Sequence, residues 1–518
     1  MSAERAPFFT LRRCALLAAI LTLIGAIRIV STYTVLSHTV DEPIHLGAGM
    51  EWLDHGTITG DASHPPLARA LSALGPWLAG EHWTPTGNTL MDGMAVLGKG
   101  AHYDRMLALS RLGLLPLFLL GCVVVFLWAN HSGGPLAGLI ATFLFTTIPP
   151  VLAHAGLVTT DMAATAFTGA GAYAALRWVE RPDRLRTLLL GLAVGFGMIA
   201  KYSLVVFLPA VWVAMYLFRW PGLGATLQFA RLHWPRALAA AALACFVIWA
   251  GFRFAYGPLE YYHLSLPAPR FFDGLDMIRQ HNSNGHASYI LGERHHFGVW
   301  YFFPVTLAVK TPLAMLLLLA ASFAIAWRKH LRLAAPLGYC AVILAIAMSS
   351  RINLGVRHVM PVYVGLAVIA GCALASTKVW TPARTALLLG FLGWQAVSGV
   401  LAHPDLLSYT NELTRGRPEH FVAESDLDWG QDMHRVADFL NRHGAQEVTF
   451  TPYNVEYLKG GHAFPKVTFS DWYNPAPGWN VVSLSGLKVY NHPGWTGRYP
   501  VQYRIGRTHW AWYFPPKN

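Results

Sequence analysis

The chain has 518 residues, of which 54% are apolar and only 13% are charged, and its mean hydropathy is +0.38. Soluble domains carry about 25% charged residues, so this composition excludes a soluble multidomain enzyme. The net charge of +12 does not indicate a nucleic-acid partner, because Lys and Arg lie in short clusters between apolar runs, where they set membrane topology. The composition therefore predicts a mainly α-helical, polytopic membrane protein.

Apolar runs of about 15 to 20 residues, the length that crosses a bilayer as a helix, recur along the first 402 residues. We expect about eleven spans, at 14–35, 107–129, 134–153, 160–178, 187–200, 202–218, 237–255, 300–327, 333–349, 358–377 and 385–402. The first run lacks a small-residue cleavage site, so we expect an uncleaved span. With the N-terminus inside, the loops at 179–186, 219–236, 328–332 and 378–384 are cytoplasmic, and each carries Lys or Arg, as the positive-inside rule requires.

This topology divides the chain into a membrane domain, residues 1–402, and an extracytoplasmic α/β domain, residues 403–518. Two long loops of the membrane domain, 36–106 and 256–299, lie on the outer side of the inner (plasma) membrane. In the terminal domain, we expect a strand at 421–426 (FVAESD), a helix that Asp432 caps and Gly444 ends, and a strand in EVTFTPY, which begins at Glu447.

Acidic side chains mark the outer boundary of two expected spans. Asp41 and Glu42 follow the first span in TVDEPIHLGAG, and Asp161 opens the fourth in GLVTTDMAATAF. Ionisable groups at a membrane edge are costly and usually functional, so we expect all three carboxylates to belong to a catalytic site. The alternative is helix capping, which Asp41 before Glu42 and Pro43, and Thr160 with Asp161, would also suit.

Basic residues on the same side run against the positive-inside tendency. They are Lys201 beside Tyr202 in a tight hairpin, then Lys310, Arg351, and Arg357 beside His358. A lipid phosphate would explain them, because Arg binds phosphate oxygens in a bidentate fork and Lys acts as a point charge. The alternative for any one of them is snorkelling toward ordinary headgroups.

Polar loop residues offer a sugar-binding surface on this side. His64 lies in DASHPPLARAL before an expected amphipathic helix, and Asn282, His286 and Glu293 lie in HNSNGHASYILGERHH. Amides, imidazoles and aromatic rings suit sugar hydroxyls and pyranose faces, but they also form ordinary interfacial belts. Glu293 with His295 and His296 is a weak candidate for a divalent ion (Mg²⁺, Mn²⁺ or Ca²⁺), because adjacent histidines lack helical metal-site spacing.

A further acidic motif, SDLDWGQD, carries Asp426 and Asp428 at the spacing that nucleotide-sugar enzymes use to hold a metal diphosphate. It would face outside, away from cytoplasmic nucleotide sugars. We therefore expect the two aspartates to order the terminal domain or the acceptor entrance.

Taken together, several of these motifs resemble the protein O-mannosyltransferase family and, more closely, bacterial phospholipid-carrier-dependent glycosyltransferases, both of the GT-C superfamily. The motifs are the Asp-Glu pair, HPPL, TTD, KYS and GVRH. The resemblance implies a GT-C fold, an inverting transfer and a polyprenyl-phosphate sugar donor. By position it implies that Asp41 is the acid–base residue and Asp161 the second acidic group. It does not identify the acceptor.

The expected function is transfer of a sugar from a polyprenyl-phosphate donor to an extracytoplasmic glycan, lipid or protein. Asp41 would accept the proton of the acceptor hydroxyl, with Glu42 and Asp161 orienting the acceptor or a divalent ion, while Arg357, Lys201 and Arg351 stabilise the departing phosphate. Membrane lipids surround the site, and the sequence suggests no cofactor other than a divalent cation. Two alternatives stay open: a transporter or flippase of a polyprenyl-linked or lipid substrate, and a ligase of a preassembled glycan.

Overall fold

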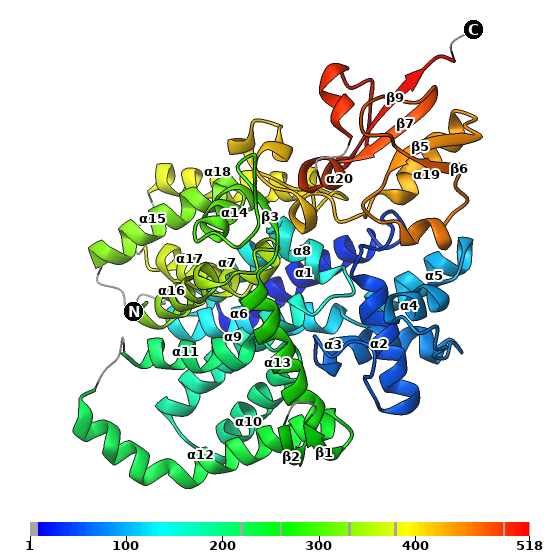
Figure 1. Cartoon of the computed structure of the whole chain (residues 1–518). Helices are drawn as coiled ribbons and strands as arrows, with labels where there is room; N and C mark the ends of the chain where they lie inside the picture. Colours follow the sequence, from blue (N-terminus) through cyan, green and yellow to red (C-terminus); the bar gives the residue numbers. More distant parts are fainter. Residues whose placement is uncertain are drawn as a thin grey trace.

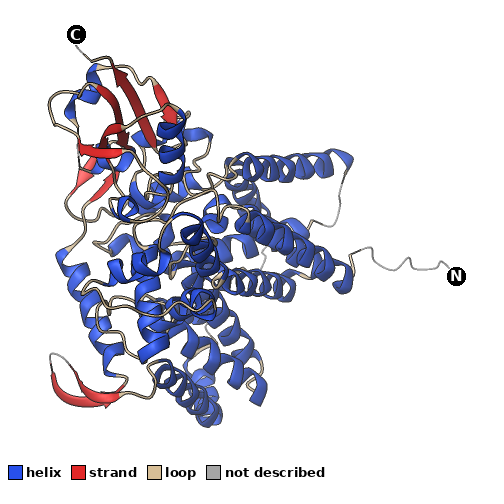
Figure 2. Cartoon of the chain, turned by 90° about the vertical axis from the view of Figure 1, so that its right-hand side faces the viewer, coloured by secondary structure: helices blue, strands red, loops and turns tan. Residues whose placement is uncertain are grey.

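Helices make up most of the chain, and a small sheet lies at one end of the helical bundle (Figure 1). The structure is a computed structural model that describes residues 9–217, 221–259, 262–329, 333–377, 381–490 and 493–516. Figure 2 shows the same sheet at the end of the molecule opposite the hairpin β1–β2. Parts of three loops that we expect to be cytoplasmic, residues 219–220, 330–332 and 378–380, lie outside the described residues.

A helix or a bent helix pair lies at each position where we expect a span. These are α1 (Leu11–Val30), α6 (Leu115–Gly133), α7 (Pro135–Thr147) with α8 (Pro149–Ala155), α9 (Asp161–Glu180), α10 (Arg184–Met198), α11 (Leu204–Leu217), α12 (Leu223–Gly251), α14 (Phe302–Lys310) with α15 (Leu313–Lys329), α16 (Ala334–Ser349), α17 (Val362–Ala375) and α18 (Pro382–Leu401).

The expected count of eleven spans is not confirmed by the helices of the described chain. By length and composition, four helices of the described chain can cross a membrane, or up to six if the bent pairs α7–α8 and α14–α15 each form one span. The pairs bend by 69° and 110°, and proline, which removes a helical hydrogen bond, lies at both breaks. Helices α11, α16 and α17 have only 14 to 16 residues. At 1.5 Å per residue, such helices are shorter than a hydrocarbon core of about 30 Å.

Shorter helices form the loops between these segments. The first loop holds α2 (Glu42–His55), α3 (Pro66–Leu78), α4 (Thr89–Leu97) and α5 (Gly100–Leu112), and the second holds β1 (Tyr256–Leu259), β2 (Tyr262–Pro267), α13 (Pro269–Asn284), β3 (Ser288–Ile290) and β4 (Glu293–His295). Pro43 and Pro66 stand in the first turns of α2 and α3, where the missing N–H would have no helical partner. The helix expected after HPPL is thus confirmed.

Glycines let α2 pack against its neighbours at very short distances. A Cβ atom at Gly49 would lie 2.2 Å from the carbonyl oxygen of Arg69 on α3, and one at Gly93 of α4 would lie 1.9 Å from that of Pro43. Larger side chains at these positions would push the helices apart. The close packing fixes the first turn of α2, where the acidic pair lies.

The C-terminal part forms a five-stranded sheet of order β6-β5-β7-β9-β8. Strand β5 pairs in parallel with β6 and β7, whereas β9 is antiparallel to both β7 and β8. The strands are β5 (Glu447–Thr451), β6 (Lys466–Phe469), β7 (Gly478–Ser483), β8 (Tyr503–Ile505) and β9 (His509–Phe514), and the helices are α19 (Met433–Arg442) and α20 (Leu484–Val489). Strand β5 and helix α19 form where the sequence predicts, with Gly444 just beyond the end of α19. Asp432 is at the N-cap position, but its side chain makes no cap bond and instead accepts hydrogen bonds from Arg435 and Thr508.

The strand expected at 421–426 is wrong. This segment joins two short 3₁₀ turns, η3 (Pro418–His420) and η4 (Glu424–Asp426), and Val422 makes a single bridge to Ile290. Glu424 has a φ of +49°, which an extended strand does not permit, and its N–H donates to Ser485 Oγ at 2.9 Å. The other 3₁₀ turns are η1 (Val356–His358), η2 (Glu412–Thr414), η5 (Glu456–Lys459) and η6 (Gly494–Arg498).

Candidate active site

Four segments that lie far apart in the sequence bring charged side chains to one place. Asp41 precedes α2, Asp161 begins α9, and Lys201 lies in the turn between α10 and α11. Arg357, in η1, donates from Nη1 to Oδ2 of Asp41 at 3.0 Å, and the same nitrogen lies 3.9 Å from Oδ2 of Asp161. Lys201 Nζ donates to the other oxygen of Asp161. The four charges alternate in sign along the cluster, and we call Asp41, Arg357, Asp161 and Lys201 the charge cluster.

The capping alternative for the two aspartates is not supported by their contacts. Asp41 is the N-cap residue of α2, yet its side chain bonds no backbone N–H of that helix. Helix α9 likewise has no side-chain cap bond from its N-cap residue, Thr160. Both carboxylates lie near the positive end of a helix dipole, which favours their negative charge, but they point toward Arg357 and Lys201 instead.

The two aspartates differ in their access to solvent. The Asp41 side chain is 30% exposed, whereas that of Asp161 is 1% exposed. Arg357 is held between them because its guanidinium stacks on the Trp429 ring, with 4.3 Å between its central carbon and the ring centroid. Only Asp41 can therefore meet a hydroxyl that enters from outside the cluster.

Glu42 has a different position from its neighbour. Its carboxylate accepts two hydrogen bonds from Arg111, each at 2.9 Å, and one each from the N–H groups of Thr39 and Val158. Burial alone would raise the pKa of Glu42, but Arg111 and these N–H groups lower it below its usual value. Because both oxygens are occupied, the geometry does not favour the expected role of Glu42 in orienting an acceptor.

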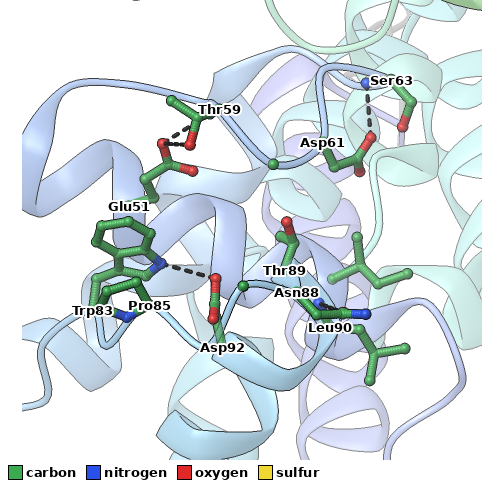
Figure 3. A pocket seen from close by; sticks show the side chains of 13 residues that line it. Glu51, Thr59, Asp61, Ser63, Trp83, Pro85, Asn88, Thr89, Leu90 and Asp92 are labelled. Atoms are coloured by element: carbon green, nitrogen blue, oxygen red, sulfur yellow. Dashed lines mark hydrogen bonds between the residues drawn. The ribbon is translucent and has the colours of Figure 1, made fainter.

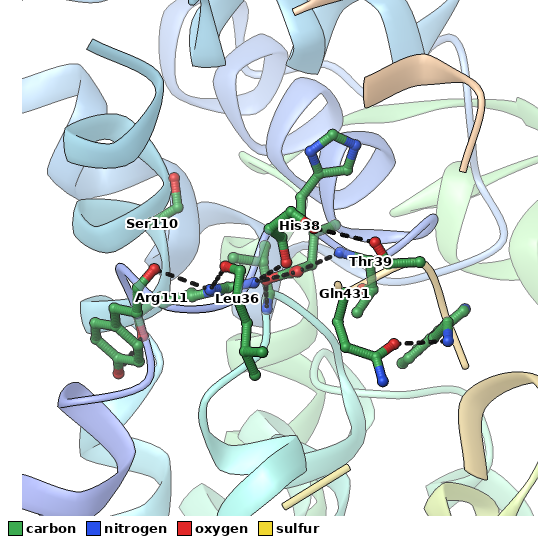
Figure 4. A network of polar contacts seen from close by, with 12 residues as sticks. Leu36, His38, Thr39, Ser110, Arg111 and Gln431 are labelled. Atoms are coloured by element: carbon green, nitrogen blue, oxygen red, sulfur yellow. Dashed lines mark hydrogen bonds and ion pairs between the residues drawn. The ribbon is translucent and has the colours of Figure 1, made fainter. Parts of the chain in front are cut away.

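Arg111 ties this pair to the segment that leads from α1 into α2. Its two terminal nitrogens donate to the carbonyl oxygens of Leu36 and Ser37, each at 2.8 Å. Figure 4 shows Arg111 beside Leu36, His38 and Thr39 at the centre of this network. The Glu42–Arg111 pair therefore fixes the chain immediately before Asp41.

Three of the residues expected to bind phosphate lie elsewhere. Lys310 is 1% exposed, and its Nζ donates to the carbonyl oxygens of Leu407 and Asp426, each at 2.6 Å. Arg351 is exposed, and its Nη1 donates to the Ser283 carbonyl at 3.3 Å. Tyr202 packs in an apolar cluster against Phe271. Their contacts indicate structural roles, because no hydrogen bond or ion pair joins any of these three side chains to the charge cluster.

His358 and two of the four expected sugar-binding residues lie near the cluster. Burial and the charges of Lys201 and Arg357 hold the pKa of His358 well below 6.5. The pKa of His64 is also held well below 6.5, by burial and then by His45, Arg69 and Lys201. Burial lowers the pKa of His286, with further contributions from His281 and Arg357. Charges of the cluster contribute to all three shifts, so these imidazoles lie within its electrostatic influence.

Asn282 and Glu293 have other surroundings. Asn282 Oδ1 accepts hydrogen bonds from Ser350 Oγ and the Arg351 N–H, at 2.9 and 3.0 Å, and so fixes a turn. Glu293 is exposed on β4. Within the described residues, Glu293, His295 and His296 are not part of any group of side chains placed to hold a metal ion.

Sequence reasoning missed four residues that lie at or beside the cluster. His45 follows Asp41 by one helical turn, and that spacing could have revealed it. His154 Nδ1 lies 4.0 Å from Asp161 Oδ2, without a signal in the sequence. Glu424 and Trp429 belong to the stretch around SDLDWGQD. Burial raises the pKa of Glu424 to about 7, although Arg357 opposes this shift.

The aspartates of SDLDWGQD order the chain, as the sequence predicts. Asp426 Oδ1 accepts the N–H of Val356, next to Arg357, at 3.0 Å. Asp428 Oδ2 accepts from Ser483 Oγ at 2.6 Å and from the Ser485 N–H at 3.0 Å. This motif therefore holds η1 and the C-terminal part together.

A cavity of about 760 Å³ lies in the first loop (Figure 3). Its carboxylates already have partners in the loop: Glu51 accepts from Thr59, Asp92 from Trp83, and Asp61 pairs with Arg69. The polar lining thus stabilises the loop itself. Arg69 Nε also lies 3.4 Å from His45 Nδ1, and His45 lies one helical turn after Asp41. Arg69 therefore connects the lining of the cavity to the charge cluster.

The chain is similar in sequence to a known protein family and in fold to several solved structures. Residues 14–252 match the family described as dolichyl-phosphate-mannose-protein mannosyltransferase. The matched stretch contains Asp41, Asp161 and Lys201, and it ends before Arg357. No curated protein matches the chain.

Solved structures match nearly the whole chain in fold. ArnT from Cupriavidus metallidurans bound to undecaprenyl phosphate matches with a TM-score of 0.54 at 14% identity, over 95% of this chain and 97% of that one. Its apo structure gives 0.53 at 16% identity, over 95% and 97%. The Archaeoglobus fulgidus oligosaccharyltransferase tethered with an acceptor peptide gives 0.50 at 11% identity, over 93% of this chain and 72% of that one.

These identities are low, so the structural matches establish the fold alone. Together with the family match, they confirm the resemblance seen in the sequence: the chain is a membrane protein with the GT-C fold, and its residues 14–252 match the protein mannosyltransferase family.

Proposed function

We propose that the chain is an inverting membrane glycosyltransferase, which moves a sugar from a polyprenyl-phosphate carrier to an acceptor on the extracytoplasmic side of the membrane. The charge cluster carries this proposal. It places a partly exposed carboxylate beside Arg357, which has Lys201 close by on Asp161. A sugar phosphodiester needs cations at its phosphate, and an acceptor hydroxyl needs a base, so this cluster offers both kinds of group.

The donor class rests on two comparisons. The family matched by residues 14–252 is named for dolichyl-phosphate-mannose, and ArnT was solved with undecaprenyl phosphate. Both names describe a polyprenyl chain joined to one phosphate. Two cations in the charge cluster suit a single phosphate group.

In the proposed reaction, the acceptor hydroxyl attacks the anomeric carbon from the side opposite the phosphate. The new glycosidic bond forms as the bond from the anomeric carbon to the phosphate oxygen breaks, and the configuration inverts. The hydroxyl proton passes to Asp41, and the carrier leaves as polyprenyl phosphate. Arg357 and Lys201 stabilise the negative charge that builds on the phosphate as it leaves. The leaving group therefore needs little protonation by a general acid.

Burial distinguishes the roles of the two aspartates. Asp41 is exposed enough to contact an acceptor, and its single hydrogen bond to Arg357 leaves its other oxygen available to take a proton. Asp161 is enclosed and bonded to Lys201. We therefore assign the base role to Asp41, and to Asp161 the positioning of the two cations.

The proposal is tested with the full chain in lipid nanodiscs and a panel of undecaprenyl-phosphate monosaccharides whose sugar is radiolabelled. Membrane extract supplies the acceptor. Release of undecaprenyl phosphate and incorporation of label are measured for the wild type and for D41N. A general base contributes about 10²- to 10⁴-fold, so we expect D41N to lose activity by that factor. Asn has nearly the same shape as Asp, and the Asp41 side chain makes no cap bond to α2, so we expect α2 to stay folded.

The matched control is D438N, which removes an exposed carboxylate on α19. It should transfer sugar at the wild-type rate. Full activity of D41N would remove Asp41 from the base role. A wild-type chain that, in sealed liposomes, moves the labelled donor from one leaflet to the other without releasing undecaprenyl phosphate would instead establish the transporter alternative.

A further inference from the structure

A second cluster of ionisable groups lies where the C-terminal part contacts the first loop. Asp104 is on α5, His434 is in the first turn of α19, and His462 follows η5. One ligand atom from each residue lies within 4.8 Å of those of the other two. Among the residues that the structure describes, only these three form such a group. None of them belongs to the charge cluster.

The three side chains are packed closely together. His462 Nε2 lies 3.0 and 2.9 Å from the two carboxylate oxygens of Asp104. His434 Nε2 lies 3.5 Å from Oδ1 of the same carboxylate. The two imidazole rings are stacked, with centroids 4.1 Å apart and an angle of 17° between their planes.

His434 is the residue that ordinary packing does not explain. Its side chain is 5% exposed, and neither ring nitrogen makes a hydrogen bond of good geometry, although the backbone of Val35 and the Asp104 carboxylate lie near the ring. A buried polar group without a partner costs about 1–3 kcal/mol, so native structures rarely keep one without a reason. In a neutral imidazole, the ring nitrogen that carries no proton has a free lone pair. Such a nitrogen can donate its lone pair to a metal ion.

The backbone holds the ligands in place from both sides. The Gly100 N–H at the start of α5 donates to the Gly461 carbonyl at 2.8 Å, and the Gly461 N–H donates back to Gly98 at 3.3 Å. His462 therefore stays close to the helix that carries Asp104. His434 is fixed by α19, and its ring contacts Tyr103 and Tyr457 edge to face.

We propose that Asp104, His434 and His462 bind one divalent transition-metal ion of the zinc type. Two imidazoles and a carboxylate are ligands that Zn²⁺ takes, with water in the fourth position, whereas Mg²⁺ and Ca²⁺ require mainly oxygen ligands. Zinc ligands at about 2.0–2.1 Å from the ion lie about 3.3 Å apart in a tetrahedron, and the 3.5 Å between His434 Nε2 and Asp104 Oδ1 is close to that separation.

The bound ion would fasten the C-terminal part to the first loop, because its ligands come from both. It would also restrict the motion of the chain segment that leads to Asp41 of the charge cluster. The hydroxyl group of Tyr103, beside Asp104, accepts a hydrogen bond from the N–H of His38 at 2.9 Å, three residues before Asp41. The ion's role is structural and is independent of which sugar is transferred.

The test uses the full chain in detergent, freed of any affinity tag and dialysed against EDTA. It is then exposed to zinc and dialysed again, and the zinc that remains is measured by elemental analysis. We expect one tightly held zinc ion per chain in the wild type, and its loss in H462A, H434A and D104N. The matched control is H443A, at the exposed end of the same helix as His434, which should keep the ion.

Two measurements on the wild type stand even if a variant fails to fold. Added zinc should raise the midpoint of thermal unfolding, since an ion that binds only the folded chain stabilises it. Co²⁺ in place of zinc should give a visible absorption spectrum with a stoichiometry of one. A wild type that keeps no zinc after dialysis, or variants that all keep it, would overturn the proposal.

Discussion

At the scale of single residues, burial and partners separate side chains that look alike in the sequence. Asp41 and Glu42 are neighbours, yet one faces Arg357 and is partly exposed, while the other is enclosed by Arg111 and backbone N–H groups. Arg357 and Arg351 are six residues apart, and only Arg357 meets an acidic partner in the charge cluster. The residue types identify candidate site residues, and the contacts of each side chain show which of the candidates belong to the charge cluster.

Glu424 gives a prediction about pH. Its carboxyl group is buried near Arg357, Asp41 and Asp426 and is bonded to Tyr453, and burial raises its pKa to about 7. Below that pH it is neutral. Above it, a further negative charge lies beside Asp41 and Arg357 and opposes the donor phosphate. We expect the KM for donor to rise as the pH increases from 6 to 8 in the wild type, and to rise less in E424Q.

The same shift has a consequence for stability. The folded chain keeps the Glu424 proton at pH values where the unfolded chain has lost it, so the contribution of Glu424 to the free energy of unfolding falls as the pH rises from about 4.5 to 7 and is then constant. E424Q cannot ionise. Its melting temperature relative to the wild type should therefore increase between pH 5 and pH 8. An unchanged difference would show that Glu424 is not protonated in the folded chain.

At the scale of elements, helix α2 sets the geometry of the site. Its first turn is held by the close contact of Pro43 with Gly93, and the turn before it is held by Arg111 through Glu42 and the carbonyls of Leu36 and Ser37. Asp41 has little freedom to move because it lies between these two contacts. The Glu42–Arg111 pair is thus a positioning device for Asp41.

Removal of one member of this pair should destabilise the chain strongly. E42Q leaves the buried Arg111 without its counter-charge, and a broken buried ion pair costs about 3–5 kcal/mol. We expect a clear fall in the melting temperature of E42Q in detergent. The double variant E42Q/R111M should recover part of the loss, because it leaves no unpaired charge.

The control is E51Q, which alters another buried carboxylate on α2 that accepts only neutral donors, Thr57 and Thr59. It should cost less than E42Q. If E42Q kept wild-type stability but lost transfer, Glu42 would act in the reaction rather than in the scaffold.

At the scale of the whole molecule, the C-terminal part and the bundle share one site. Trp429 stacks on Arg357, Asp426 accepts the N–H of Val356, and Lys310 at the end of α14 donates to the carbonyls of Leu407 and Asp426. These contacts make the C-terminal part a wall of the charge cluster. Its removal would release Arg357 from one side.

Lys310 allows a test of this contact between the C-terminal part and the helical bundle. If it is structural, K310M leaves two buried carbonyls unpaired, which costs about 1–3 kcal/mol each, and protease should release the C-terminal part more readily. The KM for donor should change little at temperatures where the variant is folded. If Lys310 instead binds the donor phosphate, as the sequence alone suggested, K310M would raise the KM and resist protease like the wild type.

Much of this protein follows from the sequence itself. Long apolar runs dictate helices, and proline and glycine mark where α2, α3 and α19 begin or end. The types and spacing of Asp41, Asp161, Lys201 and Arg357 single them out, because charges at a membrane edge are too costly to be common. These are local properties of the chain, which the sequence determines directly.

Only the tertiary structure decided which of these charges meet. Whether a cation faces a substrate or a carbonyl depends on long-range packing, so Lys310 and Arg357 could not be told apart beforehand. The segment at 421–426 has strand-like residues, but its contacts with Ser485 and Val356 hold it in 3₁₀ turns. Burial is likewise a property of the folded chain, and it makes Asp41 reachable and Asp161 enclosed.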